Sequence, residues 1–312
     1  MTTFAFVFPG QGSQSVGMLD AWGDHPAVRD TLAEASQALG EDIGRLIHEG
    51  PKDQLDLTTN TQPVMLAAAV ACYRAWMAET ARAPSVVAGH SLGEYSALVA
   101  AGVITLADAL PLVRFRAQAM QEAVTVGDGA MAAILGLDAE VVRSTCEEVA
   151  AASGGVVSAA NYNDPKQTVI AGSKAAVDQA CEALKGRGAK RALPLAVSAP
   201  FHCALMKPAA ERLKERLATV ALAAPKIPVV NNIDVAVQTE PDAIREALYR
   251  QAFGPVRWVE IVQAIRARGA THLFECGPGK VLAGLAKRID GELIVGNVLD
   301  PATLAEAKGM LP

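Results

Sequence analysis

The serine at position 91 stands in the segment of this chain with the clearest chemical potential. Residues 89–93 read GHSLG, which is the G-x-S-x-G spacing, and they follow a short apolar run at 86–88. In a nucleophile elbow a strand ends, the chain turns sharply and a helix begins, which leaves the serine hydroxyl exposed. The flanking glycines let strand and helix approach closely. We therefore predict that Ser91 is a nucleophile; the alternative is an incidental serine in an ordinary strand–turn–helix.

A serine hydroxyl needs a neighbouring base near neutral pH, and histidine is the usual one. His202 is the best candidate because it follows a segment that we predict to be a small inserted domain, and clefts form where domains meet. His90 adjoins Ser91. Because adjacent side chains diverge on a sharp turn, we expect His90 to lie behind the nucleophile. The other histidines, in polar, helix-end and strand-like segments, are His25, His48 and His272.

The order of predicted elements indicates an α/β fold with two domains. Short apolar segments alternate with helical patterns up to about residue 121 and again from about 203 to 295, which is typical of a parallel sheet. Between them, the order β-α-β-β-α-β is that of a ferredoxin-like unit. We predict a large α/β domain made of residues 1–125 and 198–312, with a ferredoxin-like small domain, residues 126–197, inserted into it.

Composition limits the classes of function. The chain has 312 residues, a net charge of −5 and no basic run, so we expect no nucleic-acid binding. Its five cysteines are scattered without a C-x-x-C pair, which argues against a zinc site and favours a reducing compartment. Cys203 adjoins His202 and is not expected to act as a nucleophile. The absence of a signal-peptide pattern and of a membrane-spanning apolar stretch predicts a cytoplasmic protein.

Two glycine-rich loops follow predicted strands. Residues 10–12 (GQG) hint at a dinucleotide fingerprint, but Ser15 stands where that motif needs its third glycine. Such a loop can instead present backbone N–H groups to an anion. Residues 277–280 (GPGK) lack the spacing of a phosphate-binding loop, and we interpret them as a tight turn between strand and helix.

Several segments together resemble one family, the malonyl-CoA:acyl-carrier-protein transacylases, which are related to the acyltransferase domains of fatty acid and polyketide synthases. The segments are residues 8–14 (FPGQGSQ), 61–63 (TQP), 89–95 (GHSLGEY), Arg116 with 120–121 (MQ), 129–133 (GAMAA), 161–163 (NYN), 200–202 (PFH) and 275–282 (ECGPGKVL). They follow the family's order over nearly the whole chain. The resemblance implies a hydrolase-like α/β domain with a ferredoxin-like insertion.

The resemblance also implies roles for individual residues. Ser91 would carry the acyl group, with His202 as its base. The backbone N–H groups of Gln11 and Leu92 would form the oxyanion hole. Arg116 would bind the malonyl carboxylate, since a planar guanidinium can hold a carboxylate through two hydrogen bonds.

Further residues are expected around the substrate. Phe201, next to the base, resembles the malonyl-preferring form of the family, because its ring would fill the space that an α-methyl group needs. The remaining expected residues are Gln62, Asn161 and Asn163 in contact with the substrate, and His90 and Arg257 behind the catalytic residues.

Two points stay open at the level of sequence. On a helix over residues 106–121, Arg114 and Arg116 lie equally far from the centre of the apolar stripe, so periodicity does not choose between them. The preference for Arg116 rests on the resemblance. Residues 254–258 read GPVRW, where many relatives begin this segment with Asn, and the group that orients His202 is therefore uncertain.

The predicted activity is transfer of a malonyl group from malonyl-CoA to the phosphopantetheine thiol of acyl carrier protein, through a malonyl-serine, in fatty acid or polyketide synthesis. We expect no metal or redox cofactor and a monomeric chain. One alternative is an esterase or thioesterase that uses the same elbow. The other is a non-catalytic binding protein, which the complete set of motifs disfavours.

Overall fold

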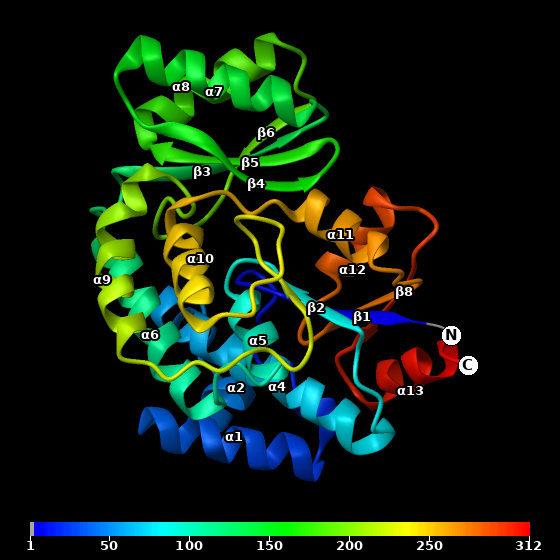
Figure 1. Cartoon of the computed structure of the whole chain (residues 1–312). Helices are drawn as coiled ribbons and strands as arrows, with labels where there is room; N and C mark the ends of the chain where they lie inside the picture. The colour runs from blue at the N-terminus through cyan, green and yellow to red at the C-terminus, as the bar shows by residue number, and fades with distance from the viewer. Residues whose placement is uncertain (1–2) are drawn as a thin grey trace.

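The larger of two sheets is fully parallel and positions the elbow. The protein is represented by a computed structural model that describes residues 3–312; Met1 and Thr2, the start of the predicted large domain, lie outside the described residues. The sheet has the order β7-β2-β1-β8-β9, and every neighbouring pair is parallel (Figure 1). Its strands are β1 (Phe4–Phe8), β2 (Val86–Gly89), β7 (Val229–Val230), β8 (His272–Cys276) and β9 (Ile294–Val298).

Helices cover both faces of this sheet. They are α1 (Pro26–Leu39), α2 (Ile43–Glu49), α3 (Lys52–Leu55), α4 (Thr58–Thr80), α5 (Gly93–Ala100), α6 (Leu106–Glu122), α9 (Lys207–Ala218), α10 (Pro241–Phe253), α11 (Trp258–Ala267), α12 (Val281–Ile289) and α13 (Pro301–Met310), with 3-10 turns at Asp20–Trp22 and Ala204–Met206. Along β1 the phenylalanines 4, 6 and 8 join the core on the α4 side. Ala5 and Val7 join the core under α11 and α12, as period-two alternation requires.

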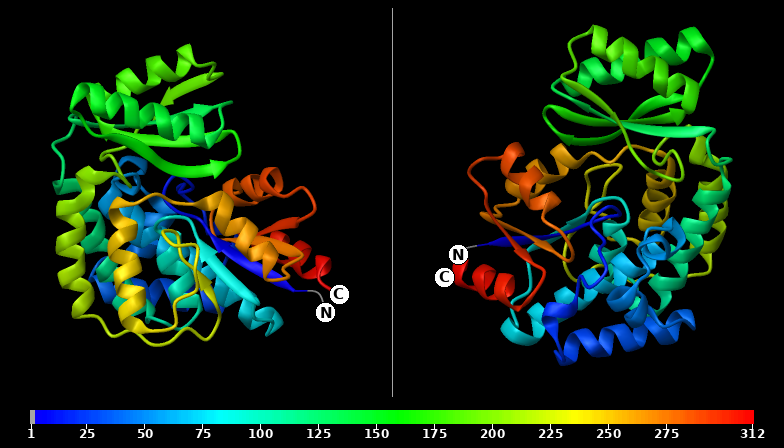
Figure 2. Two further views of the ribbon diagram at one scale, coloured as in Figure 1. Left: turned by 45° about the horizontal axis from the view of Figure 1, so that its top comes forward. Right: turned by 180° about the vertical axis from the view of Figure 1, so that it is seen from behind.

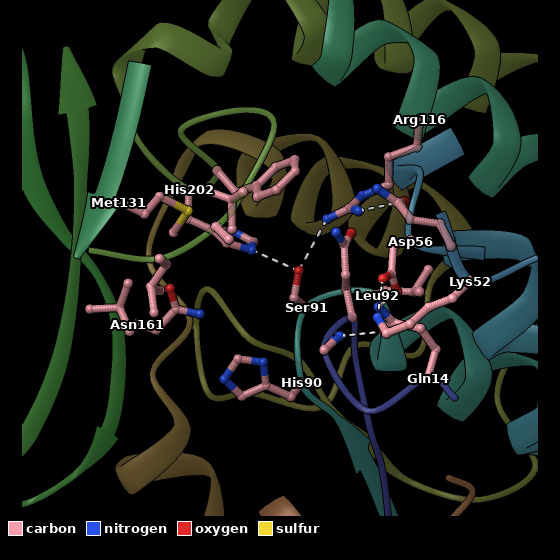
Figure 3. Close-up of a pocket in the computed structure, with 18 residues that line it drawn as sticks. Gln14, Lys52, Asp56, His90, Ser91, Leu92, Arg116, Met131, Asn161 and His202 are labelled. Atoms are coloured by element: carbon pink, nitrogen blue, oxygen red, sulfur yellow. Dashed lines mark hydrogen bonds and ion pairs between the residues drawn. The ribbon is translucent and has the colours of Figure 1, made fainter. Parts of the chain in front are cut away.

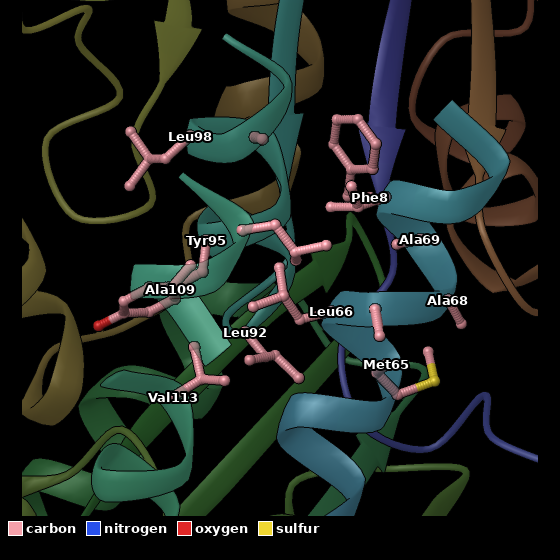
Figure 4. Packing of buried hydrophobic residues seen from close by; sticks show 14 of the residues in the cluster. Phe8, Met65, Leu66, Ala68, Ala69, Leu92, Tyr95, Leu98, Ala109 and Val113 are labelled. Carbon is pink, nitrogen blue, oxygen red and sulfur yellow. The ribbon is translucent and has the colours of Figure 1, made fainter. Parts of the chain in front are cut away.

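The core on the α4 side brings three helices against the elbow. Helix α4 packs against both α5 and α6, and the side chain of its Leu66 points toward Leu92 (Figure 4). Leu92 and Tyr95, from the start of α5, are buried in this core together with Leu66. The backbone around residue 91 is therefore embedded in rigid packing.

The smaller sheet is antiparallel, with the order β4-β5-β3-β6. Its strands and helices, in chain order, are β3 (Gly129–Leu135), α7 (Ala139–Ser153), β4 (Val157–Asp164), β5 (Gln167–Ser173), α8 (Lys174–Gly186) and β6 (Arg191–Pro194). Helices α7 and α8 lie on the face away from the larger sheet (Figures 1 and 2). This is the predicted β-α-β-β-α-β order, and the predicted fold class is confirmed.

Direct contacts join the smaller sheet to the rest of the chain. Val256, between α10 and α11, pairs with β4: its N–H donates to the carbonyl of Ala160 at 2.9 Å, and its carbonyl accepts from the N–H of Tyr162 at 2.9 Å. Arg288 of α12 forms an ion pair with Asp164 at 2.8 Å. The inner face of the smaller sheet is therefore held over the carboxyl ends of the parallel strands.

Some elements differ from the sequence prediction. Strand β7 is only two residues long, because the chain turns away from β2 after Val230. Helix α13 lies beyond the predicted alternation, which ends at about residue 295, and begins at a capping box in which Asp300 and Thr303 bond each other's backbone N–H groups. Within residues 3–312, no helix has both the length and the apolar character needed to cross a bilayer.

Candidate active site

Loops from several parallel strands meet at one edge of the larger sheet, because parallel strands end on the same side. A cavity of about 490 Å³ opens there, beneath the inner face of the smaller sheet (Figure 3). Its lining includes Gln11, Ser91, Arg116 and His202 from the larger domain, and Met131 and Asn161 from the smaller sheet.

The turn after β2 has the geometry of a nucleophile elbow. Ser91 adopts a φ of 53°, a left-handed conformation that costs a non-glycine residue about 1 kcal/mol or more. A Cβ on Gly89 would lie 1.9 Å from the carbonyl of Gly93, and a Cβ on Gly93 would lie 2.0 Å from the carbonyl oxygen of Phe8. Both positions therefore require glycine. Helix α5 begins at Gly93, two residues after the nucleophile, which leaves Ser91 on the turn.

His202 lies against this serine. Its Nε2 is 2.7 Å from the Ser91 hydroxyl, and its Nδ1 is 3.0 Å from the carbonyl oxygen of Gln251 and 3.1 Å from that of Gly254. Since carbonyl oxygens only accept, the proton resides on Nδ1 and Nε2 is free to accept from the hydroxyl. Burial, and then the charge of Arg116, lower the pKa of His202 to about 3. The imidazole is therefore held neutral, and two main-chain carbonyls orient it.

The structure shows which of Arg114 and Arg116 faces the cavity, a choice that the sequence pattern left open. Arg114 forms an ion pair with Glu41 at 2.7 Å at the surface. Arg116 is only 2% exposed and points into the cavity. Its Nη1 donates to Gln62 Oε1 at 2.8 Å, and its Nη2 donates to Gln251 Oε1 at 3.1 Å.

Arg116 also lies close to the reacting serine. Its Nη2 is 3.4 Å from the Ser91 hydroxyl (Figure 3). Among residues 3–312 no carboxylate forms an ion pair with it, and its Nε lacks a hydrogen-bond partner. Burial lowers the pKa of Arg116. A buried cation whose hydrogen-bond partners are neutral amides and a hydroxyl is costly, so this site favours an anionic ligand.

Two backbone N–H groups face the same cavity. Gln11 follows β1 and Leu92 follows the nucleophile, and both residues line the cavity. Within the part of the chain that the structure describes, neither N–H has a protein acceptor. The loop that carries Gln11 is seated against the elbow, since a Cβ on Gly10 would lie 2.6 Å from the carbonyl oxygen of His90. Paired free donors of this kind stabilise an oxyanion.

The other expected residues divide into two groups. Gln62, Asn161 and Phe201 line the cavity as expected, and the side-chain oxygen of Asn161 has no partner among the described residues. His90 was expected behind the nucleophile, but it also belongs to the lining. Asn163 is not in the lining; its Oδ1 instead contacts Nε2 of His90 at 2.8 Å. Arg257 also lies outside the lining, because its guanidinium pairs with Glu260 at 2.5 Å. Asn163 therefore bonds His90 in this structure, and its expected contact with the substrate stays a prediction.

Comparison with known proteins identifies the family. The family model of the acyl transferase domain matches residues 5–288. A malonyl CoA-acyl carrier protein transacylase of Escherichia coli (strain K12) is 56% identical over 308 residues, which are 98% of this chain and 99% of that protein. The chain belongs to the malonyl-CoA–acyl carrier protein transacylase family.

Solved transacylase structures share the whole fold. An acyl-carrier-protein S-malonyltransferase from Burkholderia pseudomallei 1710b is 67% identical, with a TM-score of 0.96 over 98% of this chain and 99% of that one. A malonyl-transacylase in complex with a type II PKS acyl-carrier protein is 52% identical, with a TM-score of 0.96 over 98% and 99% of the two chains. The family predicted from the sequence segments is thus confirmed.

Three polar residues of this transacylase-family site were missed by the sequence analysis. Asn232 accepts the N–H of Ser91 at 2.7 Å and donates to the carbonyl of Gly89 at 2.6 Å. The side chain of Gln251 contacts Ser91 and Arg116. Glu94 is buried, and its carboxylate accepts hydrogen bonds from the backbone N–H of Asn232 and from the side-chain amide of Gln251. Burial raises the pKa of Glu94 to about 7. Glu94 lay within the segment that carried the resemblance, whereas Asn232 and Gln251 belong to no motif and are brought in by the fold.

Proposed function

We propose that this chain is a malonyl-CoA:acyl-carrier-protein S-malonyltransferase. The observation that carries the proposal is the position of one hydroxyl: Ser91 Oγ lies 2.7 Å from His202 Nε2 and 3.4 Å from Arg116 Nη2. One cavity therefore holds a nucleophile, a neutral base and a buried cation that has no ion-pair partner among residues 3–312. The names of the relatives and the relative bound to an acyl-carrier protein support the same donor and acceptor.

The first half-reaction loads the serine. Ser91 Oγ attacks the thioester carbonyl of malonyl-CoA while His202 Nε2 takes the hydroxyl proton. The oxyanion of the tetrahedral intermediate is stabilised by the N–H groups of Gln11 and Leu92. When the carbon–sulfur bond breaks, His202 returns its proton to the sulfur. Free CoA leaves and a malonyl-serine ester remains.

The second half-reaction transfers the malonyl group from Ser91 to acyl carrier protein. The phosphopantetheine thiol of acyl carrier protein attacks the ester carbonyl and gives its proton to His202. The ester bond breaks, and His202 protonates the Ser91 oxygen that leaves. Through both halves Arg116 holds the malonyl carboxylate. The kinetics are therefore ping-pong.

A hydrolase with the same elbow is the competing function. The buried guanidinium of Arg116 favours the transferase, because an uncharged acyl group would leave it unpaired. The test is incubation with malonyl-CoA, with and without acyl carrier protein, followed by mass spectrometry of the intact protein. We expect a stable malonyl adduct on Ser91 that disappears when carrier protein is added, with formation of malonyl carrier protein. Rapid release of malonate without transfer, or no adduct, would overturn the proposal.

The proposal also covers the cofactor requirement, the pathway, the oligomeric state and the cellular compartment. Acyl transfer between thiols changes no oxidation state, so the side chains suffice without a metal or redox cofactor. We place the protein in fatty acid or polyketide synthesis, as a monomer in the cytoplasm. The five cysteines support this compartment, since each is a free thiol.

A further inference from the structure

Glu94 is a carboxylate buried behind the reacting groups, and no step of the proposed reaction uses it. It lies on the first turn of α5, three residues after the nucleophile, and is 2% exposed. Its Oε2 accepts two hydrogen bonds, from the N–H of Asn232 at 2.9 Å and from Nε2 of Gln251 at 3.1 Å. Burying a carboxylate costs free energy unless hydrogen bonds of this kind compensate it, so we expect a role that explains its position.

The carboxylate fixes which way the amide of Gln251 points. Nε2 of Gln251 donates to Glu94 and also to the main-chain oxygen of Ser91, at 2.9 Å. The main-chain oxygen of Ser91 only accepts, and Oε2 of Glu94 accepts here as well, so the NH₂ group must face them. The amide oxygen then faces Nη2 of Arg116. With the amide flipped, an oxygen would meet the carboxylate and an NH₂ group would meet the guanidinium, and both contacts are unfavourable.

The guanidinium of Arg116 is held by two such amide oxygens, those of Gln251 and Gln62. Together they set its place beside Ser91. Glu94 also acts on Arg116 by charge, since it counts among the groups that oppose the lowering of the pKa of Arg116. Without the carboxylate, only the main-chain oxygen of Ser91 still holds the NH₂ group of Gln251, and one of the two supports of the guanidinium is weakened.

The same carboxylate supports the elbow. It binds the N–H of Asn232, whose side chain holds the N–H of Ser91 and the carbonyl of Gly89. Because Ser91 is held in a left-handed conformation, the bonds around it must maintain that strain. Two chains of hydrogen bonds therefore lead from Glu94, one to the nucleophile and one to Arg116.

We propose that Glu94 is a positioning residue that, through Gln251 and Asn232, sets the selectivity for a malonyl group and the rate of serine acylation. The inference rests on the proposed function, because its effect is read on malonyl transfer. What matters is an acceptor oxygen at this place. An amide at position 94 can keep its oxygen toward the same two donors, whereas an apolar side chain leaves both donors buried and unpaired.

The test compares Glu94→Leu, Glu94→Gln and Ser96→Ala. Ser96 is an apt control because it lies on α5 and is 1% exposed, yet its hydroxyl has no partner among the described residues. Acylation is measured separately with malonyl-CoA and acetyl-CoA. For Glu94→Leu we expect kcat/KM with malonyl-CoA to fall about 10- to 100-fold and the malonyl-to-acetyl preference to fall about tenfold. Glu94→Gln should keep most of the kcat/KM with malonyl-CoA and most of the malonyl-to-acetyl preference. Ser96→Ala should match the unaltered protein in both quantities.

Two results would overturn the inference. One is an unchanged malonyl-to-acetyl preference in Glu94→Leu; the other is a loss in Glu94→Gln as large as in Glu94→Leu. If Glu94→Leu does not fold, Gln251→Met replaces it, since this change keeps the main-chain carbonyl that orients His202. The preference must fall in that variant too, and an unchanged preference again refutes the proposal. Failure of the unaltered protein to transfer malonyl is a different result, because it refutes the proposed function itself.

Discussion

The hydroxyl of Ser91 lies 2.7 Å from Nε2 of His202, although 111 residues separate them in the chain. Both residues have left-handed backbones, with φ of 53° and 61°. Each stands at a sharp change of direction, Ser91 where β2 gives way to α5 and His202 where the chain returns from the smaller sheet. Strained backbones of this kind persist where surrounding packing over-determines them, and they concentrate at functional sites.

Removing either partner of this contact should abolish efficient loading. Ser91→Ala should form no malonyl adduct, and His202→Gln should slow adduct formation about 10³-fold or more, because the hydroxyl loses its base. Rapid-mixing mass spectrometry with malonyl-CoA measures both. His272→Gln is the matched control, since His272 is also buried but lies on β8, away from the cavity, and bonds the hydroxyl of the preceding Thr271. Comparable loading in His202→Gln and His272→Gln would contradict the assignment.

The pH profile should lack the acid limb of an ordinary histidine. A lowered pKa means that the neutral, proton-accepting form of His202 persists as the pH falls, and its pKa is lowered to about 3. We therefore expect no loss of kcat/KM from His202 protonation between pH 8 and about 5, the span that contains its ordinary pKa of about 6.5. The measurement is kcat/KM for malonyl-CoA against pH.

The variant Arg116→Ala tests what lowers the pKa of His202. Burial is the larger cause and the positive charge of Arg116 the next, so Arg116→Ala should move the acid limb to higher pH. The variant is assayed with acetyl-CoA, which does not need the guanidinium. An acid limb near pH 6.5 that persists in Glu94→Gln, which removes the carboxyl group with a pKa of about 7, would show that the imidazole is not held neutral as the geometry indicates.

Local patterns in the sequence were sufficient for the fold class and for the elbow that carries Ser91. Ser91 lies in a motif whose glycines are required by contacts of about 2 Å, so its structure follows from neighbouring residues. The β-α-β-β-α-β order of the smaller sheet likewise follows from local periodicity. His202 was found by elimination among five histidines and by resemblance, because its contact with Ser91 is not local.

The supports of the site could not be predicted in the same way. Asn232 follows β7 and Gln251 lies in α10, and each reaches Ser91 only because the strand order places its loop or helix beside the elbow. The choice between Arg114 and Arg116 also needed the structure. Both lie beside the same apolar stripe, and only the position of neighbouring helices decides which one is buried.

Arg116 and Arg114 provide a matched pair for substrate selectivity. Arg116→Ala should reduce kcat/KM for malonyl-CoA about 100-fold, since a buried charge-assisted pair is worth about 3 kcal/mol or more, and should leave acetyl-CoA much less affected. Arg114→Ala removes a surface ion pair with Glu41 and should alter neither substrate. The measurement is the ratio of the two acylation rates in each variant. An unchanged ratio in Arg116→Ala would reject its role in binding the carboxylate.

The close packing at the elbow gives a prediction about stability that does not depend on the reaction. In Gly93→Ala the new methyl group would lie 2.0 Å from the carbonyl oxygen of Phe8, a backbone atom of β1 that cannot move without disturbing the sheet. We expect a loss of about 3 kcal/mol or more in the free energy of unfolding, or failure to fold. Gly186→Ala, at the end of α8, is the control, because nothing lies within 4 Å of its added methyl group. There the smaller backbone entropy of alanine in the unfolded chain should raise stability by about 0.5 kcal/mol. Urea unfolding monitored by circular dichroism measures the free energy of unfolding of both variants. A Gly93→Ala variant as stable as Gly186→Ala would show that β1 and α5 are not packed as closely as described.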